Sequence, residues 1–127
     1  MKKNEWEAYY GQDTKPSKYG ARKVVVDGVT FDSSKEYIRW KELQLLQRSG
    51  EICELQRQVK FSLLPAQEYK GKRVEEPVFY IADFTYIDHR TGEYVVEDVK
   101  GFKTKEYILK RKMMLYFYKI RILEVKG

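Results

Sequence analysis

Residues 78–101 read VFYIADFTYIDHRTGEYVVEDVKG, two apolar-rich runs separated by the turn-forming residues HRTG. These runs predict an antiparallel β-hairpin with a glycine-containing turn. If all four residues of HRTG form the turn, Asp83 falls directly opposite Asp98 on the partner strand. Side-chain alternation then adds Lys100 to the same face of the sheet and sends Glu97 to the other face.

Two aspartates facing each other inside a hairpin work against folding. Like charges directly opposite on neighbouring strands are destabilising, and Asp is disfavoured in strand interiors. A cation between Asp83 and Asp98 would remove this conflict. Hard oxygen ligands without a suitable His or Cys favour Mg²⁺, with Mn²⁺ as a substitute, and the backbone carbonyl of Val99 is a candidate further ligand.

Two other interpretations of the hairpin stay open. The face that carries Asp83 and Asp98 could be an ordinary solvated surface on which Lys100 pairs with the acids. A β-bulge could also shift the register by one residue, because bulges are frequent near active sites, and Glu97 would then replace Asp98 as the ligand.

Upstream of the hairpin, apolar residues change to helical spacing. They predict a helix over about 34–49 that ends at a glycine, preceded by a short hairpin with its turn at Asp27-Gly28. Glu36 lies in the first turn of this helix. It fits a capping box with Ser33, and it could equally turn inward as a further metal ligand.

The other segments complete an α/β pattern. Residues 51–64 predict a strand pair or one bent strand, residues 66–77 a polar loop, residues 103–118 a basic helix and residues 120–125 a closing strand. The expected order is therefore hairpin, helix, three strands, helix and strand. This order predicts a mixed β-sheet flanked by α-helices.

Composition limits the classes of function. A chain of 127 residues with a formal charge of +6 predicts one basic domain, over 23–127, preceded by an arm over 1–22. The single cysteine, Cys53, excludes an intrachain disulfide and a zinc finger, and favours a reducing cytoplasm. We recognise neither a secretory signal nor an apolar run long enough to cross a membrane.

Basic residues follow the hairpin closely in sequence and are candidate contacts to nucleic-acid phosphates, although a charge run of this kind is also typical of the solvated face of a helix. They are Lys103, Lys105, Lys110, Arg111 and Lys112.

An Asp on one strand, then Asp98-Val99-Lys100 on the next, preceded by a helix bearing Glu36, resembles the PD-(D/E)XK nuclease superfamily. The segments FDSSKEYIRWKELQLLQRSGEI, YIADFTYID and VVEDVKGFKTKEYILKRKMM are similar to a family of short phage and prophage proteins assigned to that superfamily. The resemblance spans roughly residues 20–125. One departure is Ala82, which stands where the superfamily usually has proline.

The resemblance implies a restriction-endonuclease-like core and Mg²⁺-dependent hydrolysis of DNA. Carried over by position, Asp83 and Asp98 bind the metal, Lys100 is the catalytic lysine, and Glu36 is the helical glutamate of junction-resolving members. Those members also imply a branched or Holliday-junction substrate, a homodimer and the cytoplasm of a bacterial host cell. The alternatives are a non-catalytic nucleic-acid-binding protein and a nicking or end-trimming nuclease of phage recombination or packaging.

Overall fold

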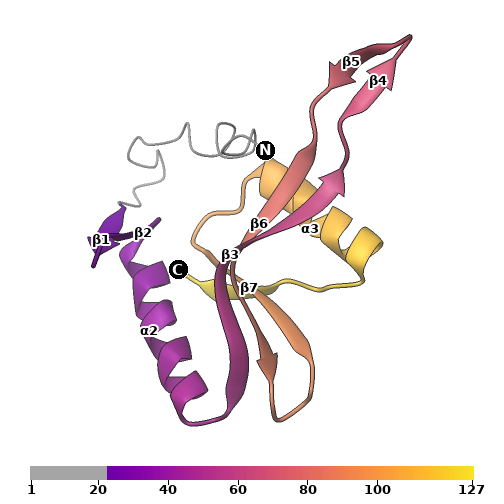
Figure 1. The fold of residues 1–127 in the computed structure, drawn as a ribbon. Coiled ribbons are helices and arrows are strands. Elements are labelled where there is room, and N and C mark those ends of the chain that lie inside the picture. Colours follow the sequence, from indigo (N-terminus) through magenta and orange to yellow (C-terminus); the bar gives the residue numbers. More distant parts are fainter. Residues whose placement is uncertain (1–22) are drawn as a thin grey trace.

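The protein is described by a computed structural model over residues 23–127, which Figure 1 shows as a ribbon. The predicted arm over 1–22 lies outside these residues. The elements in chain order are β1 (Val24–Val26), β2 (Val29–Phe31), α2 (Ser34–Arg48), β3 (Ile52–Leu64), β4 (Gln67–Tyr69), β5 (Lys72–Glu75), β6 (Val78–Asp88), β7 (Tyr94–Lys100), α3 (Lys105–Tyr118) and β8 (Leu123–Lys126).

A mixed four-stranded sheet in the order β3-β6-β7-β8 forms the centre of the fold. β6 runs antiparallel to both of its neighbours, β3 and β7, whereas β8 is parallel to β7 because α3 carries the chain across between them. α2 and α3 lie on opposite sides of this sheet (Figure 1). The predicted α/β fold, a mixed sheet flanked by helices like that of restriction endonucleases, is confirmed.

The two faces of the sheet have separate apolar cores. On the α2 side Leu43 packs with Phe84 and other side chains of the sheet. On the α3 side Met114 packs with Val96 and Ala82. Each helix therefore buries its apolar side against its own face, and both faces of the central strands are covered.

Local signals explain the ends of α2. The hydroxyl of Ser33 accepts a hydrogen bond of 3.1 Å from the amide of Glu36, which caps the first turn. The helix ends before Gly50, whose φ of +83° suits glycine. The hairpin upstream turns at Asp27 and Gly28, with φ of +50° and +78°, as the sequence predicts.

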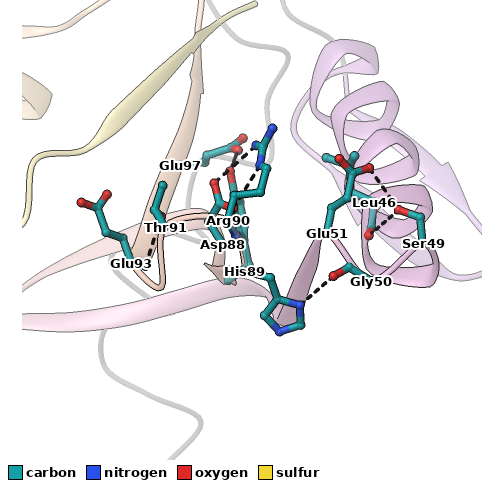
Figure 2. Close-up of polar contacts among 11 residues, drawn as sticks. Leu46, Ser49, Gly50, Glu51, Asp88, His89, Arg90, Thr91, Glu93 and Glu97 are labelled. Atoms are coloured by element: carbon teal, nitrogen blue, oxygen red, sulfur yellow. Dashed lines mark hydrogen bonds and ion pairs between the residues drawn. The ribbon is translucent and has the colours of Figure 1, made fainter.

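The β6–β7 hairpin has the predicted register. Phe84 pairs with Glu97 and Ile87 with Tyr94, and the ladder ends there, so Asp83 is the first residue of β6 beyond the paired segment. The tip of this hairpin is tied to the turn that follows α2 (Figure 2). There Nδ1 of His89 lies 2.6 Å from the carbonyl oxygen of Gly50, so the turn is fixed to the helical layer.

Residues 66–77 are not the loop that the sequence predicted. They form a second hairpin, β4–β5, which extends the β3–β6 ribbon away from the body (Figure 1). Its turn consists of Lys70 and Gly71, with φ of +52° and +79°. The segment carries no apolar alternation, because neither of its faces is buried, and this explains the error.

Residues 51–64 form one strand, β3, with irregular positions at Glu54 and Gln58, both at positive φ. The second helix begins at Lys105, two residues later than expected, because Thr104 caps it by accepting from the amide of Tyr107. Within residues 23–127, none of the helices is long and apolar enough to cross a membrane.

Candidate metal centre

Asp83 lies where the β3–β6 ladder is interrupted. Pairs form on either side, Arg57 with Phe84 and Val59 with Ala82, but none forms between Gln58 and Asp83. Gln58 has a φ of +53°, which bends β3 at this point. Ala82 and Phe84 belong to the cores on opposite faces of the sheet, so the ribbon changes face at Asp83.

The carboxylate of Asp83 is only 8% exposed and is held by the neighbouring strand. Its Oδ2 accepts a 2.8 Å hydrogen bond from the amide of Val99. The predicted role of the Val99 carbonyl as a ligand stays a prediction. The observed bond fixes Asp83 against β7.

Asp98 is 2% exposed and is held at both oxygens. The phenol of Tyr80 donates to Oδ2 at 2.6 Å, and Nζ of Lys100 lies 3.1 Å from Oδ1. The same ammonium lies 4.4 Å from the centroid of the Tyr107 ring. No donor is well aligned with the buried Oδ1, so this oxygen retains capacity to bind a cation.

Glu36 turns inward from the first turn of α2 and is 2% exposed. Its Oε1 lies 3.4 Å from Nη2 of Arg57 and 3.5 Å from Nε2 of Gln58. Only the serine half of the predicted capping box is therefore evident, because the carboxylate of Glu36 faces the sheet.

Asp32 is a fourth acid of this centre, and the sequence analysis did not identify it. Carboxylate oxygens of Asp32, Glu36 and Asp83 all lie within 4.8 Å of one another. Two oxygens bound to one Mg²⁺ at 2.0–2.1 Å are about 3 to 4 Å apart, so small side-chain shifts would bring these to coordination distance. Asp32 itself is exposed, so the centre reaches solvent on its side.

The charges of the four acids are poorly compensated. Burial raises the pKa of Glu36 to about 7, the negative charge of Asp32 adds to this, and the guanidinium of Arg57 opposes it. Burial, then the charges of Asp98 and Glu36, raise the pKa of Asp83 above its ordinary value. Burial also raises the pKa of Asp98, although Lys100 opposes it. A divalent cation would satisfy this excess of negative charge.

The donor set fits Mg²⁺ or Mn²⁺ rather than zinc. It consists of the carboxylate oxygens of Asp32, Glu36 and Asp83. Oδ1 of Asp98 is buried and faces Lys100 without an aligned hydrogen bond. Of the predicted site residues, Glu36 and Asp83 lie together with Asp32, and Lys100 pairs with Asp98; their roles stay predictions. The sequence does offer a clue to Asp32. It directly precedes Ser33, the N-cap of α2, and it stands four residues before Glu36.

Glu97, the alternative ligand, lies on the other face of the sheet. It is fully buried, and its two oxygens accept from Nε and Nη2 of Arg39 at 2.9 and 2.7 Å. The hydroxyl of Tyr86 also donates to it. Both oxygens of Glu97 are thus used to join α2 to the sheet.

The basic residues after the hairpin do not form one exposed surface. Lys110 is 6% exposed, and burial lowers its pKa to about 8, so it is not the surface phosphate contact that the sequence predicted. Arg111 lies 2.9 Å from Glu124 on β8. Exposed cations remain at Lys103, Lys105 and Lys112, and Lys103 lies 3.9 Å from Glu124.

Comparison with known proteins gives a family and no activity. No curated protein and no solved structure matches the chain. A family model described as protein of unknown function (DUF1064) matches residues 16–126, which include all four acids and Lys100. The chain therefore belongs to the DUF1064 family.

Proposed function

We propose that this protein is a Mg²⁺-dependent endonuclease that hydrolyses phosphodiester bonds in DNA, and that it is a member of the PD-(D/E)XK superfamily. One observation carries the proposal: Asp83, Asp98 and Glu36 are buried beside one another with raised pKa values, and Asp32 joins them from the solvent side. Folding alone gives no reason to bury such a set.

Asp32, Glu36, Asp83 and Asp98 would hold the cation, with Mn²⁺ able to replace Mg²⁺. A bound Mg²⁺ supplies a Lewis acid that polarises the phosphate and lowers the pKa of water at the site. Tyr80 keeps Asp98 in place through its hydrogen bond to Oδ2.

Lys100 has the geometry for a role in the reaction. Its side chain is 27% exposed, and its ammonium is held 3.1 Å from Asp98 with the ring of Tyr107 beneath it. It can donate to the attacking water or stabilise charge on the phosphate oxygens. In hydrolysis the water oxygen bonds to phosphorus, the bond from phosphorus to the leaving oxygen breaks, and that oxygen takes up a proton.

Exposed Lys103, Lys105 and Lys112 follow Lys100 along the chain and would contact DNA phosphates without reading sequence. The preferred substrate is proposed to be branched DNA such as a four-way junction. Work on such a symmetric substrate would suit a homodimer, in the cytoplasm of a bacterial cell.

The test is cleavage of end-labelled four-way junction, flap, nicked, linear duplex and single-stranded DNA with Mg²⁺, Mn²⁺ or EDTA. Asp83→Asn and Lys100→Met should each abolish cleavage and leave DNA binding intact. Asp88→Asn is the matched control, because Asp88 lies on the same strand but pairs with Arg90 at the hairpin tip. Binding without cutting by the wild-type protein, in either metal and on every substrate, would replace the proposal with a non-catalytic binding role.

A further inference from the structure

The β4–β5 hairpin is exposed on all its strand residues, from Gln67 to Tyr69 and from Lys72 to Glu75. A two-stranded hairpin that buries no apolar face contributes little to stability and is marginal by itself in water. It nevertheless projects from the body (Figure 1). Packing of the hydrophobic core therefore does not explain why the chain contains this hairpin.

The hairpin is a continuation of the ribbon that carries the metal centre. Leu64 pairs with Val78 below it and Gln67 pairs with Glu75 within it, in the same register. That register places Pro65 opposite Pro77, where neither residue has an amide hydrogen to give to a ladder. The paired prolines thus separate the hairpin from the main sheet without changing the direction of its strands.

The tip is cationic and the base is acidic. Tyr69, Lys70, Gly71 and Lys72 carry two positive charges and no acid, and the next pair joins Glu68 to Arg73. Glu75 and Glu76 lie at the base. Tyr69 is 65% exposed, and Nζ of Lys70 lies 5.4 Å from the centroid of its ring. A protruding cationic tip with an aromatic side chain is complementary to a polyanion that offers a groove.

We propose that the β4–β5 hairpin inserts its tip into the major groove of duplex DNA flanking the metal centre. The major groove of B-form DNA, about 12 Å wide, admits a two-stranded β-ribbon, whereas the deep and narrow major groove of A-form RNA does not. The shape of the hairpin therefore selects DNA as its partner. The charge and shape of the hairpin support the contact with DNA. The position of that contact relative to the cleaved bond rests on the proposed function.

The length of the ribbon sets how far away the contact lies. Gly71 precedes Asp83 by 12 residues. At about 3.3 Å per residue the tip reaches at most about 40 Å from Asp83, equivalent to about 12 base pairs of duplex. The hairpin would thus contact DNA within about 12 base pairs of the scissile phosphate.

The test compares two double variants that remove equal numbers of charges from the same hairpin. Lys70→Gln/Lys72→Gln should weaken binding to a 30-base-pair duplex in EDTA and lower the slope of log Kd against log salt by about 1.8, since each phosphate contact contributes about 0.9. Glu68→Gln/Glu75→Gln should leave the slope unchanged and bind at least as tightly. Equal melting temperatures would establish that both variants are folded.

Hydroxyl-radical footprinting locates the contact. Wild-type protein should protect a stretch within about 12 base pairs of the cleavage position, and the lysine variant should lose that stretch alone. The inference is overturned if the lysine variant binds duplex DNA like wild type, or if both variants weaken binding equally. It is also overturned if the variant loses as much affinity for A-form RNA as for DNA.

The two proposals fail separately. If wild-type protein binds DNA through Lys70 and Lys72 but never cuts it, the nuclease proposal is refuted and the hairpin contact is supported. If the lysine variant cleaves DNA and its footprint is unchanged, the nuclease proposal is supported and the hairpin contact is refuted.

Discussion

The phenol of Tyr80 donates a 2.6 Å hydrogen bond to Oδ2 of Asp98, although the two residues lie on different strands. Burial holds the pKa of Tyr80 above its ordinary value, so the phenol stays a donor at all physiological pH values. This bond fixes the carboxylate so that Oδ1 faces Lys100.

Tyr80→Phe should therefore weaken Mn²⁺ binding by about tenfold or more, because loss of an outer-shell hydrogen bond typically costs 10- to 100-fold in metal affinity. Isothermal titration calorimetry measures the change directly. Tyr86→Phe is the matched control, since Tyr86 donates to Glu97 on the other face. Equal Mn²⁺ affinity for Tyr80→Phe and wild type would show that the bond does not position Asp98 for the metal.

Metal-free protein should become more stable as pH falls from about 8 towards 5.5. The pKa of Glu36 is raised to about 7 in the folded state from an ordinary 4.5, so its ionised form destabilises the fold at pH above 7. This cost disappears as the folded protein takes up the proton between about 7 and 4.5. The raised pKa values of Asp83 and Asp98 act in the same direction.

Thermal melts in EDTA across this pH range measure the effect. Glu36→Gln should melt higher than wild type at pH 8 and show a flatter pH profile. Glu93→Gln, an exposed glutamate at the hairpin turn, serves as the control. Added Mg²⁺ should raise the melting temperature more at pH 8 than at pH 5.5, because protons compete with the cation for the carboxylates. A wild-type melting temperature that falls steadily towards pH 5.5 would contradict this.

Asp32→Asn should lower Mg²⁺ affinity and slow cleavage, because its carboxylate lies with those of Glu36 and Asp83. Asp27→Asn changes an exposed aspartate of the same small hairpin, at a φ of +50° that Asn also adopts, and should have no effect. The two variants are compared by titrating each with Mg²⁺ and measuring the shift in its melting temperature. If Asp32→Asn titrates like Asp27→Asn, the centre consists of the three buried acids alone.

Arg39→Met should destabilise the protein by roughly 3–5 kcal/mol without altering metal affinity, because it leaves the buried carboxylate of Glu97 unpaired. The double variant Arg39→Met/Glu97→Met should recover much of this loss. Urea denaturation measures both changes. A loss of Mg²⁺ affinity in the folded double variant would indicate instead that Glu97 is a metal ligand.

The sequence predicted those structural features that local rules determine. The four-residue turn at HRTG sets the register of β6 and β7, which the structure shows from the Ile87–Tyr94 pair to the Phe84–Glu97 pair. The end of α2 at Gly50 follows from a similarly local signal. Such features need no knowledge of distant contacts.

The errors concern features that tertiary structure determines. Lys110 is buried although a charged side chain is normally expected at the surface. The hydrogen bond from Tyr80 to Asp98 was not foreseen, because it depends on how β6 changes face at Asp83. The β4–β5 hairpin was missed because exposed strands carry no apolar pattern, although the turn at Lys70-Gly71 was available as a signal.

The paired prolines at the base of the β4–β5 hairpin also constrain how family members can differ in length. Pro65 and Pro77 fit the register of the pairs that flank them, Leu64 with Val78 and Gln67 with Glu75, whereas the register shifts by one residue between Gln67 and Glu68. One residue on each limb would turn the tip through half a revolution, whereas two would preserve its orientation. Relatives whose hairpins differ by two residues on each limb should therefore present the same face of the tip.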